Sequence, residues 1–389
     1  MIPHSTPYGR QSIDQADIDA VVEVLKSPWL TQGPTVERFE TAMAERCQAD
    51  FAVAVCNATA ALHIACLAAG LGPGDRLWTT PNTFVASANC GRYCGADVDF
   101  VDIDPSTWNL DAGLLAQKLD AAERDGKLPK VVVAVAFSGQ SCDMREMARL
   151  AERYDFTLIE DASHAVGAAY LGRPVGCGVY AAMTVFSFHP VKIITSGEGG
   201  MVLTNRPELA EHLRRLRSHG ITSDPAQMSV PDRGLWYYQQ LELGFNYRMT
   251  DLHAALGLSQ MLRLDGFVAR RRQLAARYDR LLADLPLTLP ATQVGAESAW
   301  HLYVVRVRFD RVKLSQRELF EALRAAGIGV NLHYIPVHLQ PYYRALGFTD
   351  GDYPEAERYF SEAISLPLFP DLTEEQQDYV IDQLRSLVG

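Results

Sequence analysis

Apolar residues in the first half of the chain fall into short runs that are separated by helical patterns. The runs predicted to be strands are Phe51–Cys56, Arg76–Pro81, Val98–Ile103, Val131–Phe137, Thr157–Asp161 and Thr184–Phe188. Amphipathic periodicity between them predicts helices at Ala60–Ala69, Phe84–Cys94 and Met144–Tyr154. Apolar strands that alternate with helices are typical of a mostly parallel sheet with helices on both faces. We therefore expect an α/β fold.

Two further helices are expected before the first of these strands. The segment Ser12-Ile13-Asp14-Gln15 fits a capping box, which would start a helix running toward Lys26. Pro34 is suited to the first position of a second helix, because its fixed φ and missing N–H cost nothing there. That helix is predicted to end near Cys47.

The pattern changes after about residue 250. The pattern there predicts a helical, arginine-rich stretch at Leu252–Leu285, a strand at Trp300–Phe309 and a helix at Gln316–Ala326. It then predicts another strand at Val330–Tyr334 and a final helix from Glu374 onward. We expect a large domain over residues 1–250 and a small C-terminal α+β domain over residues 251–389. The polar, turn-forming stretch Ile221–Gln240 is predicted to be a long loop, and loops of that length are often functional.

Composition narrows the class of protein. The 389 residues carry a net charge of −11, which argues against nucleic acid or an anionic membrane as the main partner. The chain starts without a basic or apolar leader, and its apolar runs are too short to cross a membrane. Seven scattered cysteines indicate reduced thiols in a cytoplasmic protein. Cys90 and Cys94 lack the companions that a metal site needs, so no metal is expected.

One lysine stands between two predicted strands. Lys192 follows the segment Thr184–Phe188 through His189-Pro190 and precedes the glycine-rich run Gly197-Glu198-Gly199-Gly200. Apolar surroundings lower the pKa of a lysine and supply the neutral amine that Schiff-base chemistry requires. On this segment alone, a solvated loop lysine is an equally good interpretation.

An acid pair, Glu160-Asp161, ends the apolar strand that precedes this lysine segment. Ligands of α/β proteins bind at such strand ends. A carboxylate there could keep a pyridinium nitrogen protonated, although a strand-end acid can also simply cap a helix.

Two more strand ends carry candidate ligand groups. After Phe51–Cys56 the chain enters a helix through Asn57-Ala58-Thr59, where free amides and the Thr59 hydroxyl could bind a phosphate. Phe84 follows another strand end and could stack on a flat ring, or it could be an ordinary core aromatic.

Together these segments resemble the DegT/StrS family of pyridoxal-phosphate (PLP)-dependent sugar aminotransferases, over essentially the whole chain. The motifs that carry the resemblance are TQGP (31–34), ATAAL (58–62), TFVAS (83–87), EDASHA (160–165), SFHPVK (187–192), GEGG (197–200), NYRMT (246–250) and LHYIPVH (332–338). Finer features resemble one branch, the transaminases of pseudaminic acid synthesis: SANCGRYCGADVDFVDID (87–104), RSHGI (217–221) and WYY (236–238). That branch aminates C4 of a UDP-linked 2-acetamido-2,6-dideoxy-4-hexulose with glutamate as the donor.

The resemblance implies the PLP-dependent transferase fold type I and a role for each matching residue. Lys192 would form the Schiff base and shuttle protons, Asp161 would pair with the pyridine nitrogen, His164 would lie near the ring's 3-oxygen and Phe84 would cover one ring face. Ala58, Thr59, Ser187 and a partner subunit's Asn246 would bind the phosphate. The substrate-binding set would comprise Tyr8, Trp29, Thr31, Ala58, Ser187, Asn246, His333 and Tyr334. A site shared in this way implies a homodimer.

Two departures and three alternatives remain at this stage. Ala58-Thr59 stands where many relatives have Gly-Thr, and Ala136 stands where a histidine is expected, so substrate fit could differ. A sugar dehydratase of the same fold would carry histidine in place of Lys192. A non-catalytic PLP-binding regulator would not need both Asp161 and Lys192. An aminotransferase for another UDP- or GDP-4-keto hexose is the closest alternative, because pocket contacts decide the sugar.

Overall fold

The structure is a computed structural model, which describes residues 6–230 and 234–389. Within this range a seven-stranded sheet has the order β1-β9-β8-β5-β4-β2-β3. Its strands are β1 (Phe51–Val55), β2 (Arg76–Thr79), β3 (Asp97–Phe100), β4 (Val131–Val135), β5 (Thr157–Asp161), β8 (Met183–Ser187) and β9 (Gly200–Thr204). Neighbours from β8 to β3 pair in parallel, and β9 is antiparallel to both β1 and β8. The sheet is therefore mostly parallel, as predicted.

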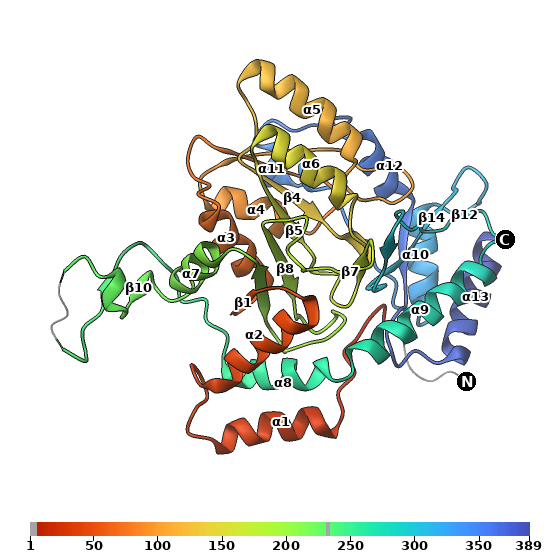
Figure 1. The fold of residues 1–389 in the computed structure, drawn as a ribbon. Coiled ribbons are helices and arrows are strands. Elements are labelled where there is room, and N and C mark those ends of the chain that lie inside the picture. The colour runs from red at the N-terminus through yellow and green to blue at the C-terminus, as the bar shows by residue number, and fades with distance from the viewer. Residues whose placement is uncertain (1–5, 231–233) are drawn as a thin grey trace.

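Helices cover both faces of this sheet (Figure 1). The helices of this part are α1 (Gln15–Lys26), α2 (Pro34–Cys47), α3 (Ala58–Ala68), α4 (Ala86–Tyr93), α5 (Ala112–Asp125), α6 (Met144–Tyr154), α7 (Pro207–Leu216) and α8 (Asp251–Met261), with a 3₁₀ turn η1 (Phe137–Gly139). Helix α1 packs on α8 rather than on the sheet. Apolar side chains of β1, β2 and β4 pack against α3 and α4 in one cluster. On the other face, Val132 and Ala134 of β4 pack with α5 and α6. The strands are buried on both faces, which explains their continuous apolar runs.

The C-terminal part is built on a second, antiparallel sheet, β12-β14-β15. Its elements are α9 (Leu264–Leu281), β12 (Leu287–Thr288), β14 (Tyr303–Val307), α10 (Gln316–Ala325), η3 (Val337–Leu339), α11 (Pro341–Arg344), α12 (Pro354–Glu362), β15 (Ala363–Leu366) and α13 (Glu374–Val388). Short strands β6 (Ala169–Tyr170), β7 (Arg173–Pro174) and β13 (Ala296–Glu297) form a third sheet that joins the two parts.

The packing continues past the predicted domain boundary at residue 250. Helix α8 contacts α1 and α2, and the first half of α9 shares an apolar cluster with β1, β8 and β9. The second half of α9 packs instead with β14 and α13. Helix α9 therefore spans both cores, and the division into residues 1–250 and 251–389 stays a prediction.

Several local expectations were wrong. The first helix is capped by Asp14 with Asp17 rather than by Ser12, because the Asp14 carboxylate accepts the N–H of Asp17. The stretch Leu252–Leu285 breaks into α8 and α9. The segment Val330–Tyr334 forms only an isolated bridge, Asn331 to Ser365, and contains a cis peptide bond between His333 and Tyr334.

The predicted loop Ile221–Gln240 contains two short strands. They are β10 (Ile221–Thr222) and β11 (Gln239–Gln240), which pair with each other, beside the 3₁₀ turn η2 (Pro225–Gln227). This segment extends away from the body of the molecule (Figure 1). Its residues 231–233 lie outside the described residues, as do residues 1–5, on which part of the expectation of no leader rests.

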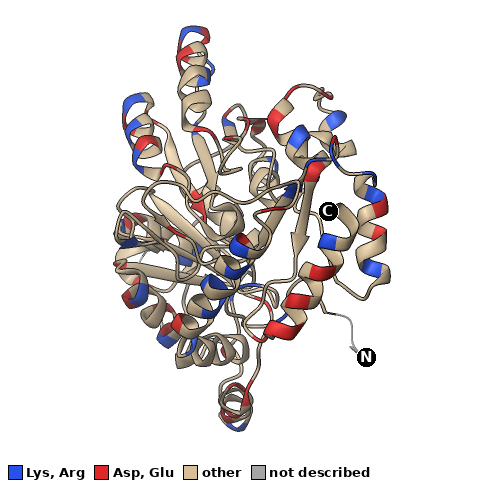
Figure 2. Ribbon diagram, turned by 90° about the vertical axis from the view of Figure 1, so that its right-hand side faces the viewer, with Lys and Arg blue, Asp and Glu red and all other residues tan. Residues whose placement is uncertain are grey.

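Charged residues of both signs occur on the surrounding helices (Figure 2). No helix of the described residues is long and apolar enough to cross a membrane. All seven cysteines are free. Within residues 6–230 and 234–389, no group of three or more His, Cys, Asp or Glu side chains is placed to hold a metal ion.

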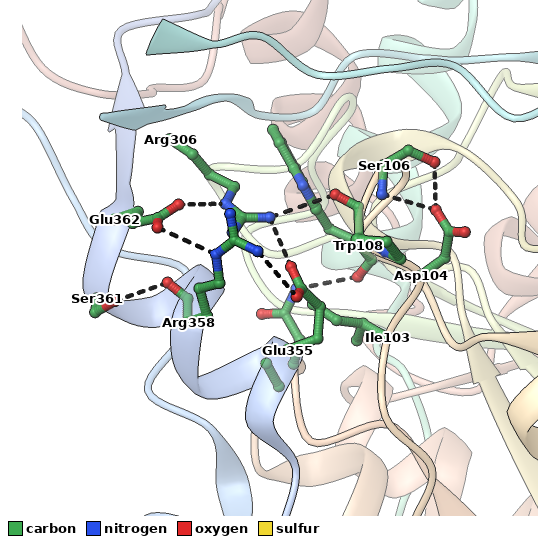
Figure 3. Close-up of polar contacts among 12 residues, drawn as sticks. Ile103, Asp104, Ser106, Trp108, Arg306, Glu355, Arg358, Ser361 and Glu362 are labelled. Atoms are coloured by element: carbon green, nitrogen blue, oxygen red, sulfur yellow. Dashed lines mark hydrogen bonds and ion pairs between the residues drawn. The ribbon is translucent and has the colours of Figure 1, made fainter. Parts of the chain in front are cut away.

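A buried arginine joins the two parts of the chain on the side of α12 (Figure 3). Arg306 of β14 donates to Glu355 and Glu362 of α12, at 2.8 Å each, and to the carbonyl of Pro105 at 3.3 Å. Asp102, beyond the end of β3, accepts the first backbone amides of α12. These contacts fix α12 against the large sheet.

Candidate functional site

A cavity of about 610 Å³ opens where several strands of the large sheet end. It is lined by Tyr8, Asn57, Ala58, Thr59, Leu62, Thr83, Phe84, Ala86, Val135, Asp161, Ser163, His164, Ser187, His189, Val191, Lys192, Glu198, His301, Asn331, Leu332, His333 and Tyr334. The carboxyl ends of parallel strands share one edge, so residues distant in sequence meet there. The C-terminal part supplies the opposite wall.

The start of α3 forms one end of this cavity. The Asn57 side chain caps the helix by accepting the N–H of Ala60 at 2.8 Å. The amides of Ala58 and Thr59 belong to the first turn, so they have no acceptor within the helix. Gly200 passes close to this turn, and a Cβ there would lie 2.6 Å from the Ala58 nitrogen. The glycine-rich run after Lys192 therefore leaves room for the turn, and the turn presents free N–H groups and a helix N-terminus to the cavity.

Lys192 projects from the loop between β8 and β9 into the cavity. No hydrogen bond or ion pair of its amine is present among the described residues. Burial lowers the pKa of Lys192 to about 8, while the negative charge of Asp161 opposes this shift. With this pKa, a fraction on the order of a tenth of the amine is neutral at pH 7, and that fraction can act as a nucleophile and a base.

Asp161 ends β5 and is only 5% exposed. One carboxylate oxygen accepts the Ser87 hydroxyl at 2.6 Å, and the other accepts the Ser163 hydroxyl at 2.6 Å and its backbone N–H at 3.1 Å. Within residues 6–230 and 234–389 the carboxylate has no ion-pair partner. Three neutral donors hold the anion in place without neutralising it, which leaves its charge available to a cationic ligand group.

His164 and Tyr334 form a hydrogen-bonded pair beside this acid. The Ser138 backbone N–H donates to Nδ1 of His164 at 3.3 Å, so Nδ1 is an acceptor and the proton of the neutral ring lies on Nε2. Nε2 is 3.2 Å from the Tyr334 hydroxyl. Burial, followed by the positive charge of Lys192, lowers the pKa of His164 well below 6.5. The ring is therefore a neutral hydrogen-bonding group.

His333 occupies the wall supplied by the C-terminal part. Its Nδ1 is 2.8 Å from the Ser365 hydroxyl, and its Nε2 accepts the Asn331 amide at 3.3 Å. Burial, followed by the charge of Lys192, lowers the pKa of His333 to about 3. The ring of Tyr8 packs at 5.3 Å from His333, between centroids. The wall is therefore aromatic and uncharged.

The residues fit PLP, which unites an anionic phosphate, a pyridine ring and an aldehyde. The free amides of Ala58 and Thr59 suit the phosphate, and the unneutralised Asp161 suits a protonated ring nitrogen. Lys192 suits the aldehyde. The three groups converge on one cavity.

Most of the predicted site residues meet in this cavity. Those that line it are Tyr8, Ala58, Thr59, Phe84, Asp161, His164, Ser187, Lys192, His333 and Tyr334. The ring of Phe84 is 57% exposed and lies 6.3 Å from that of Tyr334, so it borders the opening.

Trp29, Thr31 and Asn246 do not line the cavity of this chain. All three are exposed. Thr31 forms an isolated bridge with Thr250, so Thr31 and the segment 246–250 belong to one surface. Their assignment to the site stays a prediction.

Sequence reasoning missed Ser87, Ser163 and His301. Ser87 and Ser163 lie inside the quoted TFVAS and EDASHA motifs, so their proximity to Asp161 was a usable signal. His301 comes from the start of the predicted strand Trp300–Phe309, where no pattern marked it. Trp300 has φ +51° there, so β14 begins only at Tyr303 and His301 precedes it.

The sequence of this chain is similar to those of known aminotransferases and sugar biosynthesis proteins. The model of the DegT/DnrJ/EryC1/StrS aminotransferase family matches residues 11–385. The spore coat polysaccharide biosynthesis protein SpsC of Bacillus subtilis (strain 168) is 39% identical over 388 residues, 99% of this chain and 97% of SpsC.

The fold of this chain is also similar to those of solved aminotransferase structures. Helicobacter pylori PseC, an aminotransferase involved in the biosynthesis of pseudoaminic acid, superimposes with a TM-score of 0.89 at 29% identity, over 99% of both chains. Spr1654 of Streptococcus pneumoniae, assigned as a sugar aminotransferase, superimposes in its PLP form with a TM-score of 0.88 at 30% identity, over 99% of this chain and 98% of that one. A PMP form of Spr1654 is similar to the same extent, at 31% identity over 98% of both chains.

Proposed function

Because the chain belongs to the DegT/DnrJ/EryC1/StrS aminotransferase family, we propose that it transfers the amino group of L-glutamate to C4 of a UDP-2-acetamido-2,6-dideoxy-4-hexulose. Members of this family depend on PLP, which accepts an amino group and withdraws electrons from the carbon that bears it. The observation that carries the proposal is the convergence of an unpaired Lys192, an unneutralised Asp161 and a free helix N-terminus on one cavity.

Each of these residues has a distinct task. Asp161 keeps a positive charge on the ring nitrogen, and the amides of Ala58 and Thr59 with the Ser187 hydroxyl hold the phosphate. Phe84 covers one face of the ring at the opening. His164 would lie near the 3-oxygen of the PLP ring as a neutral hydrogen-bonding group.

Lys192 carries the proton transfers. Its neutral Nζ removes the proton from Cα of glutamate, and its charged form delivers a proton to C4 of the sugar in the second half of the reaction. The amine alternates between base and acid, so a pKa of about 8 suits it. One water molecule supplies the keto oxygen of the 2-oxoglutarate that leaves in the first half, and the ketone oxygen of the sugar leaves as water in the second half.

A homodimer would complete the site. Trp29, Thr31 and Asn246 lie on an exposed surface outside the cavity of their own chain. A second copy that presents this surface to the cavity would bring Asn246 to the phosphate and Trp29 and Thr31 to the nucleotide sugar. The seven free cysteines support a reducing compartment, and we place the enzyme in the cytoplasm.

Two observations bear on the sugar. The motifs at residues 87–104 and 217–221 and the similarity to PseC support the pseudaminic-type 4-hexulose. SpsC, at the higher identity of 39%, is named for spore coat polysaccharide biosynthesis and specifies no sugar, so a different UDP- or GDP-4-keto-6-deoxyhexose is the alternative.

A substrate panel separates these candidates. The purified enzyme would receive glutamate with enzymatically prepared UDP- and GDP-linked 4-keto sugars, and each product would be identified by mass and NMR. Selective amination of the UDP-2-acetamido-2,6-dideoxy-4-hexulose is expected. Preference for another sugar would overturn the substrate and keep the reaction class, and no amination of any sugar would overturn both.

A further inference from the structure

The C-terminal part contributes one histidine to the cavity that has no role in the proposed function. His301 is 5% exposed, lines the cavity and lies 4.3 Å from the ring of His164, between centroids. It follows Trp300, whose φ of +51° is unusual for a bulky residue. Strained backbone of this kind is concentrated at ligand sites.

Among the buried histidines of the cavity, His301 is the one whose ring has no hydrogen-bond partner within the described residues. The rings of His164 and His333 use both nitrogens in hydrogen bonds within the protein. In contrast, Nδ1 of His301 is enclosed and has no hydrogen-bond partner within the described parts of the chain. An enclosed N–H without an acceptor is rarer in proteins than an enclosed acceptor without a donor. The proton of the neutral ring therefore belongs on Nε2, which can donate into the cavity.

The backbone of His301 is held in place from the large domain. Its N–H donates to the carbonyl of Ser138 at 2.9 Å. Gly139 has φ +109°, and a Cβ there would lie 2.8 Å from the Trp300 nitrogen and 2.9 Å from that of His301. Only glycine allows this approach, which sets His301 beside His164.

A buried cation stands behind His301. Arg271 is fully buried, and its Nη1 donates to the carbonyls of Trp300, His301 and Leu368 at 2.9–3.3 Å. It forms no ion pair with any carboxylate of residues 6–230 and 234–389. A buried charge left without a counter-ion creates a positive potential around itself, which favours an anion in the adjacent cavity. Burial, followed by the positive charges of Lys192 and Arg271, keeps the pKa of His301 well below 6.5.

The amino donor brings an anion that the other cavity residues do not accommodate. No arginine of residues 6–230 or 234–389 lines the cavity, and Lys192 must stay free to react. Asp161 and the exposed Glu198 are acidic. The carbon of the donor that reacts must lie next to Lys192, so its α-carboxylate, one bond away, falls among the same residues. The sugar ring carries no carboxylate at the corresponding position.

We propose that the Nε2–H of His301 donates a hydrogen bond to the α-carboxylate of the amino donor, with Arg271 supplying the supporting positive potential. This role rests on the proposed transamination. It also assigns the two substrates different contacts on the same wall, since the 4-keto sugar would not need His301.

The two halves of the reaction can be measured separately to test this role. With PLP-loaded enzyme and no sugar, the absorbance change on adding glutamate reports donor binding and turnover. With enzyme loaded with pyridoxamine phosphate, adding the keto sugar reports the other half. For His301→Leu, the glutamate concentration at half-maximal rate is expected to rise roughly ten- to hundredfold, the range for a lost hydrogen bond to a charged group. The sugar half is expected to change by less than about threefold.

His301→Asn keeps an N–H donor, and we expect it to retain more glutamate affinity than His301→Leu. If the leucine variant does not fold, His301→Asn still tests the role of His301. His338→Asn is the matched control, because His338 is buried with an unpartnered Nδ1 too, but it pairs with Glu357 outside the cavity. The control should leave glutamate affinity unchanged.

Cofactor affinity, measured by reconstituting the apoenzyme, supplies a readout besides turnover. It should be unchanged in both His301 variants. Equal losses in both halves, weakened cofactor binding, or unaltered glutamate dependence would each overturn the role of His301. The glutamate half needs no sugar, so a failure of every sugar in the panel would sink the proposed function and still leave this test valid.

Discussion

The half-buried Lys192 and the buried Arg306 are two basic residues where the two parts of the chain meet, and they differ in their ion pairing. Arg306 is enclosed between Glu355 and Glu362, each at 2.8 Å. Lys192 has no ion-pair partner in the described residues, and its pKa is lowered to about 8. Pairing makes the arginine a structural contact, whereas the lack of an ion pair supports the reactive role that we propose for the lysine. The contrast separates a charge kept for the fold from one kept for chemistry.

Removing the unpaired amine should have the largest effect. We expect Lys192→Ala to lower turnover by about 10³-fold or more, because the nucleophile and the proton carrier are both lost. Glutamate-dependent amination, followed by mass spectrometry, measures this. An alanine variant with turnover near that of the wild type would contradict the account.

Asp161→Asn should have the next largest effect on turnover. The amide keeps the shape of the side chain but loses the charge that stabilises a protonated ring nitrogen, so a decrease on the order of 10²–10³ is expected. Glu160→Gln is the matched control, since Glu160 is equally buried but lies on the other face of β5, bonded to Ser141. If both variants lost turnover equally, Asp161 would have no special role.

Arg306→Met should affect stability rather than chemistry. Two glutamates would lose their common partner, which we expect to lower the free energy of unfolding by about 2–4 kcal/mol. Arg358→Met is the control, because Arg358 contacts the same glutamates but is 64% exposed, and it should cost less than about 1 kcal/mol. Urea denaturation of the holoenzymes measures both. If a folded Arg306→Met protein lost its cofactor, Arg306 would have a role in the site, which would contradict its assignment as a structural contact.

The smallest effect concerns pH. The charged form of Lys192 has no lone pair, so cofactor capture by the apoenzyme should accelerate with rising pH and level off above about 8. For an ordinary lysine, with a pKa near 10.4, the rate of cofactor capture would continue to rise well above that pH. The charge of Asp161 raises the pKa of Lys192, so in Asp161→Asn the midpoint should move to lower pH. Stopped-flow absorbance follows this, and an unmoved midpoint would show that Asp161 does not act on the amine.

The sequence predicted those features of the fold and the site that depend on a local pattern within one element. The apolar strand ending in Asp161 and the glycine-rich segment after Lys192 are local patterns, and the helix of Met144–Tyr154 has the predicted bounds. The turn at Ala58, which we propose to bind the phosphate, was also visible, because small residues at a strand–helix junction are local too.

Sites that depend on long-range contacts were not accessible in this way. The expected strand at Val330–Tyr334 did not form because its residues turn to the cavity and to Ser365. His301 reaches His164 only through the close approach of Gly139. The unpaired state of Lys192 is itself a tertiary property, since any of the 47 acidic residues could have been its partner.

The most direct test is to reduce the holoenzyme with borohydride and map the site of attachment by peptide mass spectrometry. The account predicts the cofactor's mass on Lys192 alone. Lys118 is an internal control, because burial lowers its pKa too but Asp99 pairs with it at 2.6 Å. Attachment at Lys118 or another lysine, or a holoenzyme that borohydride does not label, would contradict the claim that Lys192 is the reactive amine.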